Sequence, residues 1–150
     1  MSTHELTPLP FAATIEVRDA CLCLYVQRAA RALARKFDEA LRPVDLTNGQ
    51  FSLLTSLNRP EPPTMGSVAS LLAMDRTTLT AALKPLERRK LVKIAVDKED
   101  KRSRRLIITP AGRALLSKAF PIWKQTHVEV ESQIAHGSAD DLRSALRAIC

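Results

Sequence analysis

Residues 74–108 constrain the fold of this chain more than any other stretch of its sequence. After Asp75, a typical helix N-cap residue, apolar side chains recur at steps of three and four and predict a helix. Two short runs of alternating apolar residues follow, at residues 91–96 and 104–109, and these predict strands. The loop between the strands is rich in Lys and Arg. The stretch therefore predicts a helix followed by a β-hairpin with a basic turn.

The excess positive charge of the chain is concentrated in this same stretch. Residues 75–105 contain 11 Lys and Arg against 5 Asp and Glu, which gives +6, whereas the whole chain carries +7. A charge run is usually a solvated face, but here it coincides with a helix and a hairpin, the layout of a winged helix-turn-helix. In that layout the helix enters a DNA major groove and the hairpin reaches the flanking backbone or minor groove. We therefore expect double-stranded DNA as the partner.

Helical patterns lie on both sides of the hairpin. Residues 1–13 contain prolines without periodicity and are expected to form a flexible N-terminal arm. Residues 14–41 carry apolar side chains at helical spacing and predict one long helix, ended by Pro43. Such a helix spans about 40 Å, so part of its apolar face is expected to pack on a second subunit. Further helices are predicted at residues 48–58, 65–73, 76–89, 110–136 and 138–149.

Cap residues support these boundaries. Thr47 and Gln50 form a capping box, Thr64 is an N-cap, and Thr109 precedes a proline at the first helical position. Pro85 lies inside a predicted helix, where it is expected to kink that helix or to begin a late segment. Aromatic residues make up only 4% of the chain, so the core is aliphatic and favours helix packing. The predicted fold class is mainly α with a small β-hairpin wing.

Several function classes are excluded. No apolar run approaches the roughly 18 residues of a membrane span. The N-terminus lacks the pattern of a signal peptide, so we expect a cytoplasmic protein with no membrane partner. The chain has three His and no Gly-rich phosphate loop, HExxH or G-x-S-x-G motif, so we expect neither an enzyme nor a cofactor. Its three Cys lack metal-type spacing, so no metal site is expected.

Residues 100–112, DKRSRRLIITPAG, resemble the wing signature D-x-R-x(n)-L-T-x-x-G of the MarR family of bacterial transcription regulators. The signature residues in place are Asp100, Arg102, Thr109 and Gly112. Ile108 stands where Leu is usual. Residues 74–92 resemble the family's recognition helix and its turn into the wing, but Lys90 replaces a common glycine, which supplies positive φ freely. The resemblance covers residues 18–149.

The resemblance implies a single domain over residues 14–150 that forms a homodimer. Residues 14–42 and 110–150 are then N- and C-terminal dimerisation helices, and residues 47–109 form a winged helix-turn-helix DNA-binding lobe. Two lobes read half-sites of a pseudo-palindromic operator about one helical turn apart. The implied function is a sequence-specific regulator, in the family usually a repressor, that a small aromatic or phenolic ligand releases from DNA. The rival is a winged-helix protein-interaction module, which would present an apolar or acidic recognition face.

Ten residues are candidates for DNA binding. They are Thr64, Ser67, Arg76, Thr77, Thr78, Thr80, Lys84, Lys101, Arg102 and Arg104. Arg76 and Lys84 can contact bases or phosphates in the major groove. The threonines can bond phosphates or place a methyl group against thymine. Thr64 and Ser67 can add phosphate contacts at a helix start.

The wing residues have separate expected roles. Arg102 resembles the wing-tip arginine that enters the minor groove. Asp100 has the wrong sign for DNA and is expected to orient Arg102 or to close the wing turn. Because Arg104 and Arg105 alternate in direction along a strand, only one of them is expected to face DNA.

Cys21 offers an alternative, thiol-based switch. Cys21 and Tyr25 resemble the C-x-x-x-Y start of the organic-hydroperoxide-sensing branch of the family, in which the first-helix Cys reacts with peroxide. As residues i and i+4 they are expected to share a helix face, so that the phenol can bond the sulfur. Cys150 is the candidate resolving thiol from the other subunit. The competing interpretation is that Cys21 packs as a small hydrophobe, since Leu22 replaces the aromatic residue usual after the sensing Cys.

Overall fold

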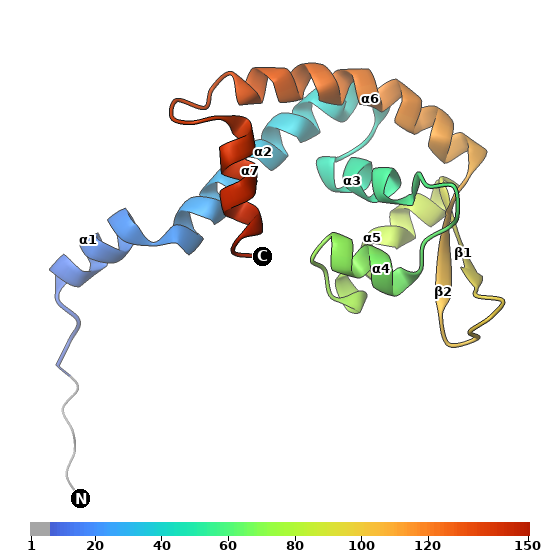
Figure 1. The fold of residues 1–150 in the computed structure, drawn as a ribbon, viewed down its shortest axis with the longest axis horizontal. Coiled ribbons are helices and arrows are strands. Elements are labelled where there is room, and N and C mark those ends of the chain that lie inside the picture. The colour runs from blue at the N-terminus through green and yellow to red at the C-terminus, as the bar shows by residue number, and fades with distance from the viewer. Residues whose placement is uncertain (1–6) are drawn as a thin grey trace, which may run out of the picture. The chain divides into compact units, whose positions relative to one another are not determined.

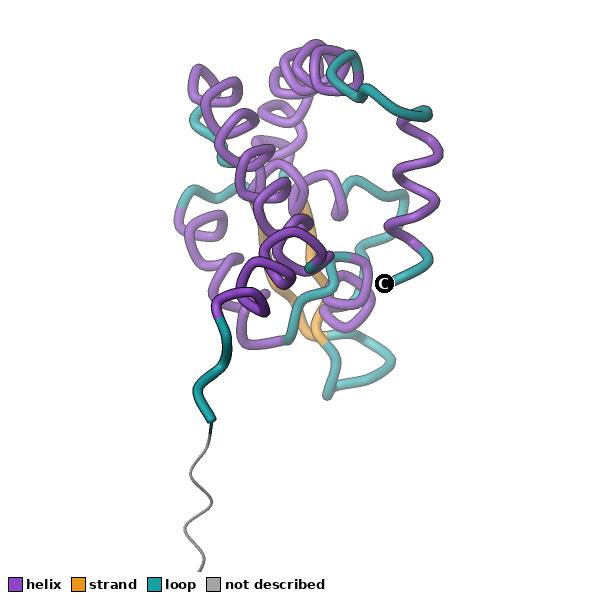
Figure 2. Tube along the Cα trace, turned by 90° about the vertical axis from the view of Figure 1, so that its left-hand side faces the viewer, coloured by secondary structure: helices purple, strands orange, loops and turns teal. Residues whose placement is uncertain are grey.

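The computed structural model describes residues 7–150 and shows a chain built mainly of helices with one two-stranded antiparallel hairpin, which confirms the predicted class (Figures 1 and 2). The elements are α1 (Phe11–Ala20), α2 (Leu22–Leu41), a 3-10 turn (Arg42–Val44), α3 (Asn48–Leu57), α4 (Met65–Leu71), α5 (Arg76–Arg88), β1 (Val92–Val96), β2 (Arg104–Ile108), α6 (Pro110–Glu131) and α7 (Ala139–Arg147). No helix within residues 7–150 has the length and apolar character needed to cross a membrane.

The predictions for the N-terminal region need correction. Residues 1–6 of the expected arm lie outside the described residues, and α1 already begins at Phe11. The single helix predicted for residues 14–41 is interrupted at Cys21, whose φ of −71° and ψ of 105° are extended. Neither Pro nor Gly marks this break. Hydrophobic spacing therefore could not reveal it, because the apolar pattern continues across the interruption.

The chain divides after Lys36 into two compact units, and residues 37–150 form the larger one. Its core is aliphatic, as expected. The side chains with the least exposure are Leu41, Leu53, Leu54, Leu57, Val68, Leu79, Leu83, Leu86 and Leu106. The rings of Phe51 and Trp123 stack 5.9 Å apart and join α3 to α6. Leu71, the last residue of the short α4, is apolar but 59% exposed.

The helix-turn-helix of α4 and α5 is fixed by local hydrogen bonds. Ala73 takes φ of 52° in the turn, and its N–H donates to the Ser70 carbonyl at 3.2 Å. The carboxylate of Asp75 then accepts the N–H of Thr78 at 2.7 Å, which confirms Asp75 as the N-cap of α5. α5 continues through Pro85 as one helix, so no separate segment begins there.

Both C-terminal helices end before their predicted boundaries, and α7 ends at Arg147, not at residue 149. α6 ends at Glu131, not near residue 136. The hydroxyl of Ser132 donates to the Glu129 carbonyl at 2.6 Å, and such bonds offer the backbone an alternative to the helix. Gly137, at φ of 69°, lies in the turn before α7 and does not end α6. Ser138 and Asp141 form a capping box at the start of α7.

Candidate nucleic-acid interface

α5 presents a polar and basic face to solvent. Leu79, Leu83 and Leu86 are fully buried, and the residues of α5 on the opposite side point outward. The exposed candidates are Arg76, Thr77, Thr78, Thr80 and Lys84. The Thr80 hydroxyl donates to the Arg76 carbonyl at 2.7 Å, so it offers a ligand its methyl group and an oxygen lone pair. Arg76 and Lys84 supply the exposed charges of this face.

The N-cap of α5 is ionised at neutral pH. Backbone and side-chain hydrogen bonds from Thr78 hold the pKa of Asp75 below its ordinary value. A carboxylate at this position also interacts favourably with the positive end of the helix dipole. The recognition helix therefore has a well-defined first turn, which fixes the direction in which Arg76 and Thr77 project.

A left-handed residue joins α5 to the wing. Lys90 has φ of 57°, and its N–H donates to the Glu87 carbonyl at 2.9 Å. The N–H of Leu91 donates to the Leu86 carbonyl, also at 2.9 Å. Lys90 thus adopts the conformation that glycine commonly provides in the MarR family, which the sequence resembles here, and the turn keeps its geometry at the cost of backbone strain.

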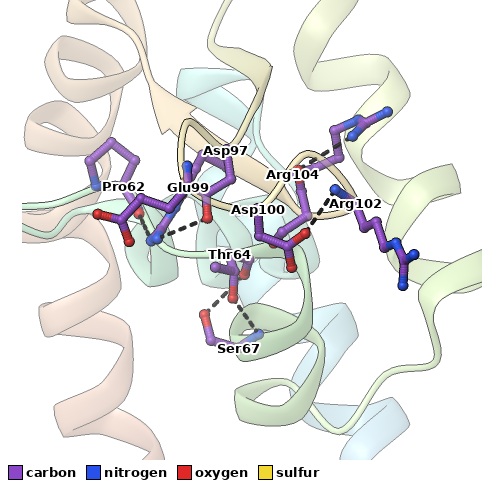
Figure 3. A network of polar contacts seen from close by, with 10 residues as sticks. Pro62, Thr64, Ser67, Asp97, Glu99, Asp100, Arg102 and Arg104 are labelled. Atoms are coloured by element: carbon purple, nitrogen blue, oxygen red, sulfur yellow. Dashed lines mark hydrogen bonds and ion pairs between the residues drawn. The ribbon is translucent and has the colours of Figure 1, made fainter.

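The wing tip is closed by Asp100. The carboxylate of Asp100 accepts the backbone N–H of Arg102 at 3.0 Å, and its carbonyl accepts the N–H of Ser103 at 2.9 Å (Figure 3). Of the two roles expected for Asp100, the structure therefore shows closure of the turn. The side chains of Lys101 and Arg102 are exposed at this tip.

Arg104 and Arg105 have different partners, in keeping with their alternation along β2. Arg104 is exposed, and its guanidinium donates to the Lys101 carbonyl at 3.1 Å. Arg105 donates through Nη1 to the Pro62 carbonyl at 2.9 Å and through Nη2 to Asp97 Oδ2 at 3.3 Å. Arg104 is thus the exposed member of the pair, and Arg105 is engaged within the protein.

Sequence reasoning missed Asp97 and Pro62 as partners of Arg105. Partial burial alone raises the pKa of Asp97, but hydrogen bonds from the Glu99 N–H and the Arg105 guanidinium outweigh it, so that the pKa lies below its ordinary value. The acidic residue at position 97, at the start of the wing loop, could have been recognised from the sequence as a partner for a nearby arginine. The hydrogen bond from Arg105 to the Pro62 carbonyl depends on tertiary structure, and no sequence pattern predicts it.

Thr64 caps α4 through two hydrogen bonds with Ser67 in the first turn of that helix. The Thr64 hydroxyl accepts the Ser67 N–H at 3.2 Å, and the Ser67 hydroxyl donates to the Thr64 carbonyl at 2.9 Å (Figure 3). Thr64 also forms an antiparallel bridge with Arg105 of β2. The start of α4 therefore lies directly beside the wing.

Two residues of the wing signature have structural roles. The Thr109 hydroxyl donates to the Lys90 carbonyl at 2.7 Å and accepts the N–H of Gly112 at 3.0 Å. Thr109 thus ties the end of the wing to the end of α5 and caps α6. A Cβ on Gly112 would collide with the Leu91 carbonyl and lie 2.8 Å from Cγ1 of Ile108. Only glycine allows α6 to approach the wing this closely.

The geometry of Cys21 differs from the expectation. Cys21 lies in the break between α1 and α2, and its Sγ accepts the N–H of Leu24 at 3.5 Å. It therefore caps α2, and the Tyr25 N–H donates to the Cys21 carbonyl at 3.2 Å. The thiol is partly exposed and free, and the thiols of Cys23 and Cys150 are exposed and free.

Comparisons with known proteins agree on one family. The model of the MarR family matches residues 46–103. The HTH-type transcriptional regulator TtmR of Methylorubrum extorquens is 35% identical over 100 residues. That match covers 67% of this chain and 51% of TtmR, so the chain spans about half the length of this relative.

Solved structures cover the chain more completely. The transcriptional regulator MosR of M. tuberculosis in complex with DNA is 36% identical, covers 86% of this chain and 92% of its own, and gives a TM-score of 0.78. The transcriptional repressor CouR bound to a 23-mer DNA duplex is 26% identical, with 95% and 96% coverage and a TM-score of 0.71. These relatives are transcriptional regulators, which confirms the expectation that the chain is not an enzyme. The chain belongs to the MarR family of winged helix-turn-helix, DNA-binding transcriptional regulators.

Proposed function

We propose that this regulator is a homodimeric repressor that a small-molecule effector releases from a pseudo-palindromic operator. The observation that carries the DNA-binding part is the combined surface of α5 and the wing. Arg76, Lys84, Lys101, Arg102 and Arg104 are all exposed on these two elements. A helix for the major groove and a basic hairpin for the flanking minor groove are the two parts that this mode of binding needs.

The chemistry of this surface also weighs against the rival protein-interaction role. The exposed face of α5 carries three threonines at positions 77, 78 and 80 between the charges of Arg76 and Lys84. Hydroxyl groups and cations suit phosphates and base edges, whereas a protein-docking face would need apolar or acidic groups. The Thr80 hydroxyl is hydrogen-bonded to the Arg76 carbonyl and that of Thr78 to Asp75. Thr77, Arg76 and Lys84 are therefore the first candidates for contacts in the major groove.

Arg102→Ala tests the wing contact. Removing this exposed guanidinium is expected to weaken operator binding about tenfold and to lower the slope of log affinity against log salt by about 1, because one phosphate-proximal cation is lost. Fluorescence anisotropy in a salt series measures both quantities. Arg147→Ala, which removes an exposed cation from α7, is the matched control and is expected to bind like wild type. Equal affinity and equal slope for Arg102→Ala and wild type would refute this role for the wing.

The dimer is supported by apolar surface at both ends of the chain. Leu142 and Leu146 lie one turn apart on α7 and are 48% and 37% exposed, and Ile149, just after the end of that helix, is 65% exposed. On α1 and α2, Val17, Leu22 and other large apolar side chains are also exposed. Burial of such stripes against a second copy removes apolar surface from water, which drives association.

The effector part of the proposal is supported by a relative. CouR from Rhodococcus jostii RHA1 has been solved with p-coumaroyl-CoA, which carries a phenolic ring, and it shares the fold of this chain. We therefore place a small aromatic or phenolic ligand first among effectors. Titration of the protein–operator complex with phenolic acids and their thioesters, read by anisotropy, tests this directly: loss of binding supports the proposal, and binding unaffected by any of them refutes it.

Thiol oxidation is the second candidate for release from DNA. Two observations favour it: the Cys21 thiol is free and partly exposed, and its sulfur caps α2. A peroxide would convert its thiolate to sulfenic acid with loss of an alcohol, and a second thiol such as Cys150 of the other subunit would then form a disulfide with loss of water. Because the sulfur caps α2, oxidation would change the start of that helix. Cys21→Ser is expected to bind operator normally and to stay bound in cumene hydroperoxide. Cys150→Ser is expected to form the sulfenic acid at Cys21 but not the disulfide, so it tests the second step alone. A Cys21→Ser protein that still releases DNA on oxidation would exclude Cys21.

A further inference from the structure

We propose that Asp97 and Arg105 form a clamp that fixes the wing against the helix-turn-helix, so that both act as positioning residues for DNA binding without contacting DNA. The inference rests on the proposed contact between the wing tip and DNA. It concerns two residues on either side of the wing loop, Asp97 just after β1 and Arg105 in β2.

The clamp joins three segments of backbone. One oxygen of Asp97 accepts the N–H of Glu99 at 3.4 Å, and the other accepts Arg105 Nη2 at 3.3 Å. Arg105 Nη1 continues the chain of contacts to the Pro62 carbonyl at 2.9 Å. Figure 3 shows Pro62 and Asp97 on either side of this network. The wing turn, β2 and the proline-rich loop of residues 59–63 are thus held by the single guanidinium of Arg105.

The proline-rich loop transmits this fixation to the DNA-binding helices. The Leu106 N–H donates to the Pro63 carbonyl at 2.9 Å, and Thr64 bridges to Arg105. Thr64 is the N-cap of α4, the first helix of the helix-turn-helix. The angle between the wing and the helices is therefore set at this junction, and with it the distance between Arg102 and the face of α5.

The burial of the pair suits a positioning role. The side chain of Asp97 is only 13% exposed, and that of Arg105 is 36% exposed. Arg104, the neighbouring arginine, alternates with Arg105 along β2 and is exposed, with hydrogen bonds only to backbone carbonyls of the wing turn. Two of the three guanidinium nitrogens of Arg105 are hydrogen-bonded to Pro62 and Asp97, which restrains this side chain against the protein.

Asp97 provides a test in which two models predict opposite signs. If Asp97 acts only as a negative charge near DNA, its neutralisation removes repulsion and strengthens binding. If it holds the clamp, Asp97→Asn loosens the wing and weakens binding. Glu99→Gln is the matched control, because Glu99 lies in the same loop, is exposed, and contributes only its backbone N–H to the network.

The experiment uses the full-length protein and an operator selected from a random duplex library with wild type. We expect Asp97→Asn to weaken binding about fivefold, and Glu99→Gln to bind equally or slightly more tightly. Arg105→Lys is expected to weaken binding similarly, although it keeps the charge, because lysine cannot bridge both partners. Thermal melting and sedimentation establish that each variant is folded and in the wild-type oligomeric state. If Asp97→Asn is unfolded, Arg105→Lys carries the test.

A double-mutant cycle separates positioning from a stability effect. Arg102→Ala is expected to cost less in the Asp97→Asn background than in wild type, because a loosened wing makes the Arg102 contact poorly in any case. Equal costs in both backgrounds, or tighter binding by Asp97→Asn, would overturn the clamp while leaving the wing contact intact. No effect of Arg102→Ala in the wild-type background would overturn the wing contact itself, and the clamp with it.

Discussion

Lys90 holds a backbone conformation that its side chain does not favour. Its φ of 57° lies in the left-handed region, where a Cβ costs roughly 1–2 kcal/mol. Lys90→Gly is therefore expected to raise the free energy of unfolding by about 1 kcal/mol, measured by denaturant titration. Lys90→Ala is the matched control, because it removes the same charge but keeps the Cβ and the strain. Equal stability of the two variants would contradict the strain argument.

Gly112 shows the opposite relation between backbone and side chain. A methyl group there would overlap the Leu91 carbonyl and push Ile108 away from the base of the wing. Gly112→Ala is expected to lower the free energy of unfolding by about 3 kcal/mol through overpacking. Gly49→Ala in α3 is the control, since its Cβ would meet only Thr47 Oγ1 at 4.0 Å. That variant should be slightly more stable than wild type, and comparable losses in both would rule out the close approach as the cause.

The capped start of α5 makes the stability of that helix depend on pH. The pKa of Asp75 is lowered in the folded protein, so its stabilisation is present above its ordinary pKa of about 4 and is lost as pH falls through the lower folded value. Asp75→Asn keeps a cap but cannot titrate. We expect wild type to melt at a higher temperature than Asp75→Asn at pH 7, and the difference to shrink below about pH 4 and to be lost only once the pH lies below the lower folded pKa. A difference independent of pH would exclude titration of Asp75.

Helices and strands could be predicted because their signals are local in the sequence. Contacts between residues far apart in the chain could not be predicted. Thr47, Asp75 and Thr109 were identified as caps because a cap bonds residues only three positions away. The break at Cys21 was missed because it leaves the apolar spacing unchanged. The exposed candidates on α5 agree with the apolar spacing at steps of three and four, which assigns the other face of that helix to the core. The partners of Arg105 could not be predicted, because Pro62 lies 43 positions away along the chain.

At the scale of the whole molecule, DNA affinity should depend on association of two chains. A single winged lobe contacts one half-site, and linking two lobes makes the second contact effectively intramolecular. The exposed stripe of α7 is the described surface best suited to test this, because Leu142 and Leu146 are large, apolar and one helical turn apart.

Placing charges on this stripe is expected to separate the subunits. The double variant Leu142→Glu and Leu146→Glu should sediment as a monomer at micromolar concentration and lose at least about 100-fold in operator affinity, since two half-sites can no longer be engaged together. Ser144→Glu adds a charge to the exposed opposite face of α7 and should remain dimeric with wild-type affinity. Analytical ultracentrifugation and anisotropy measure the two properties on the same samples. A monomeric double variant with wild-type affinity would show that one lobe suffices, and a dimeric double variant would place the subunit interface elsewhere.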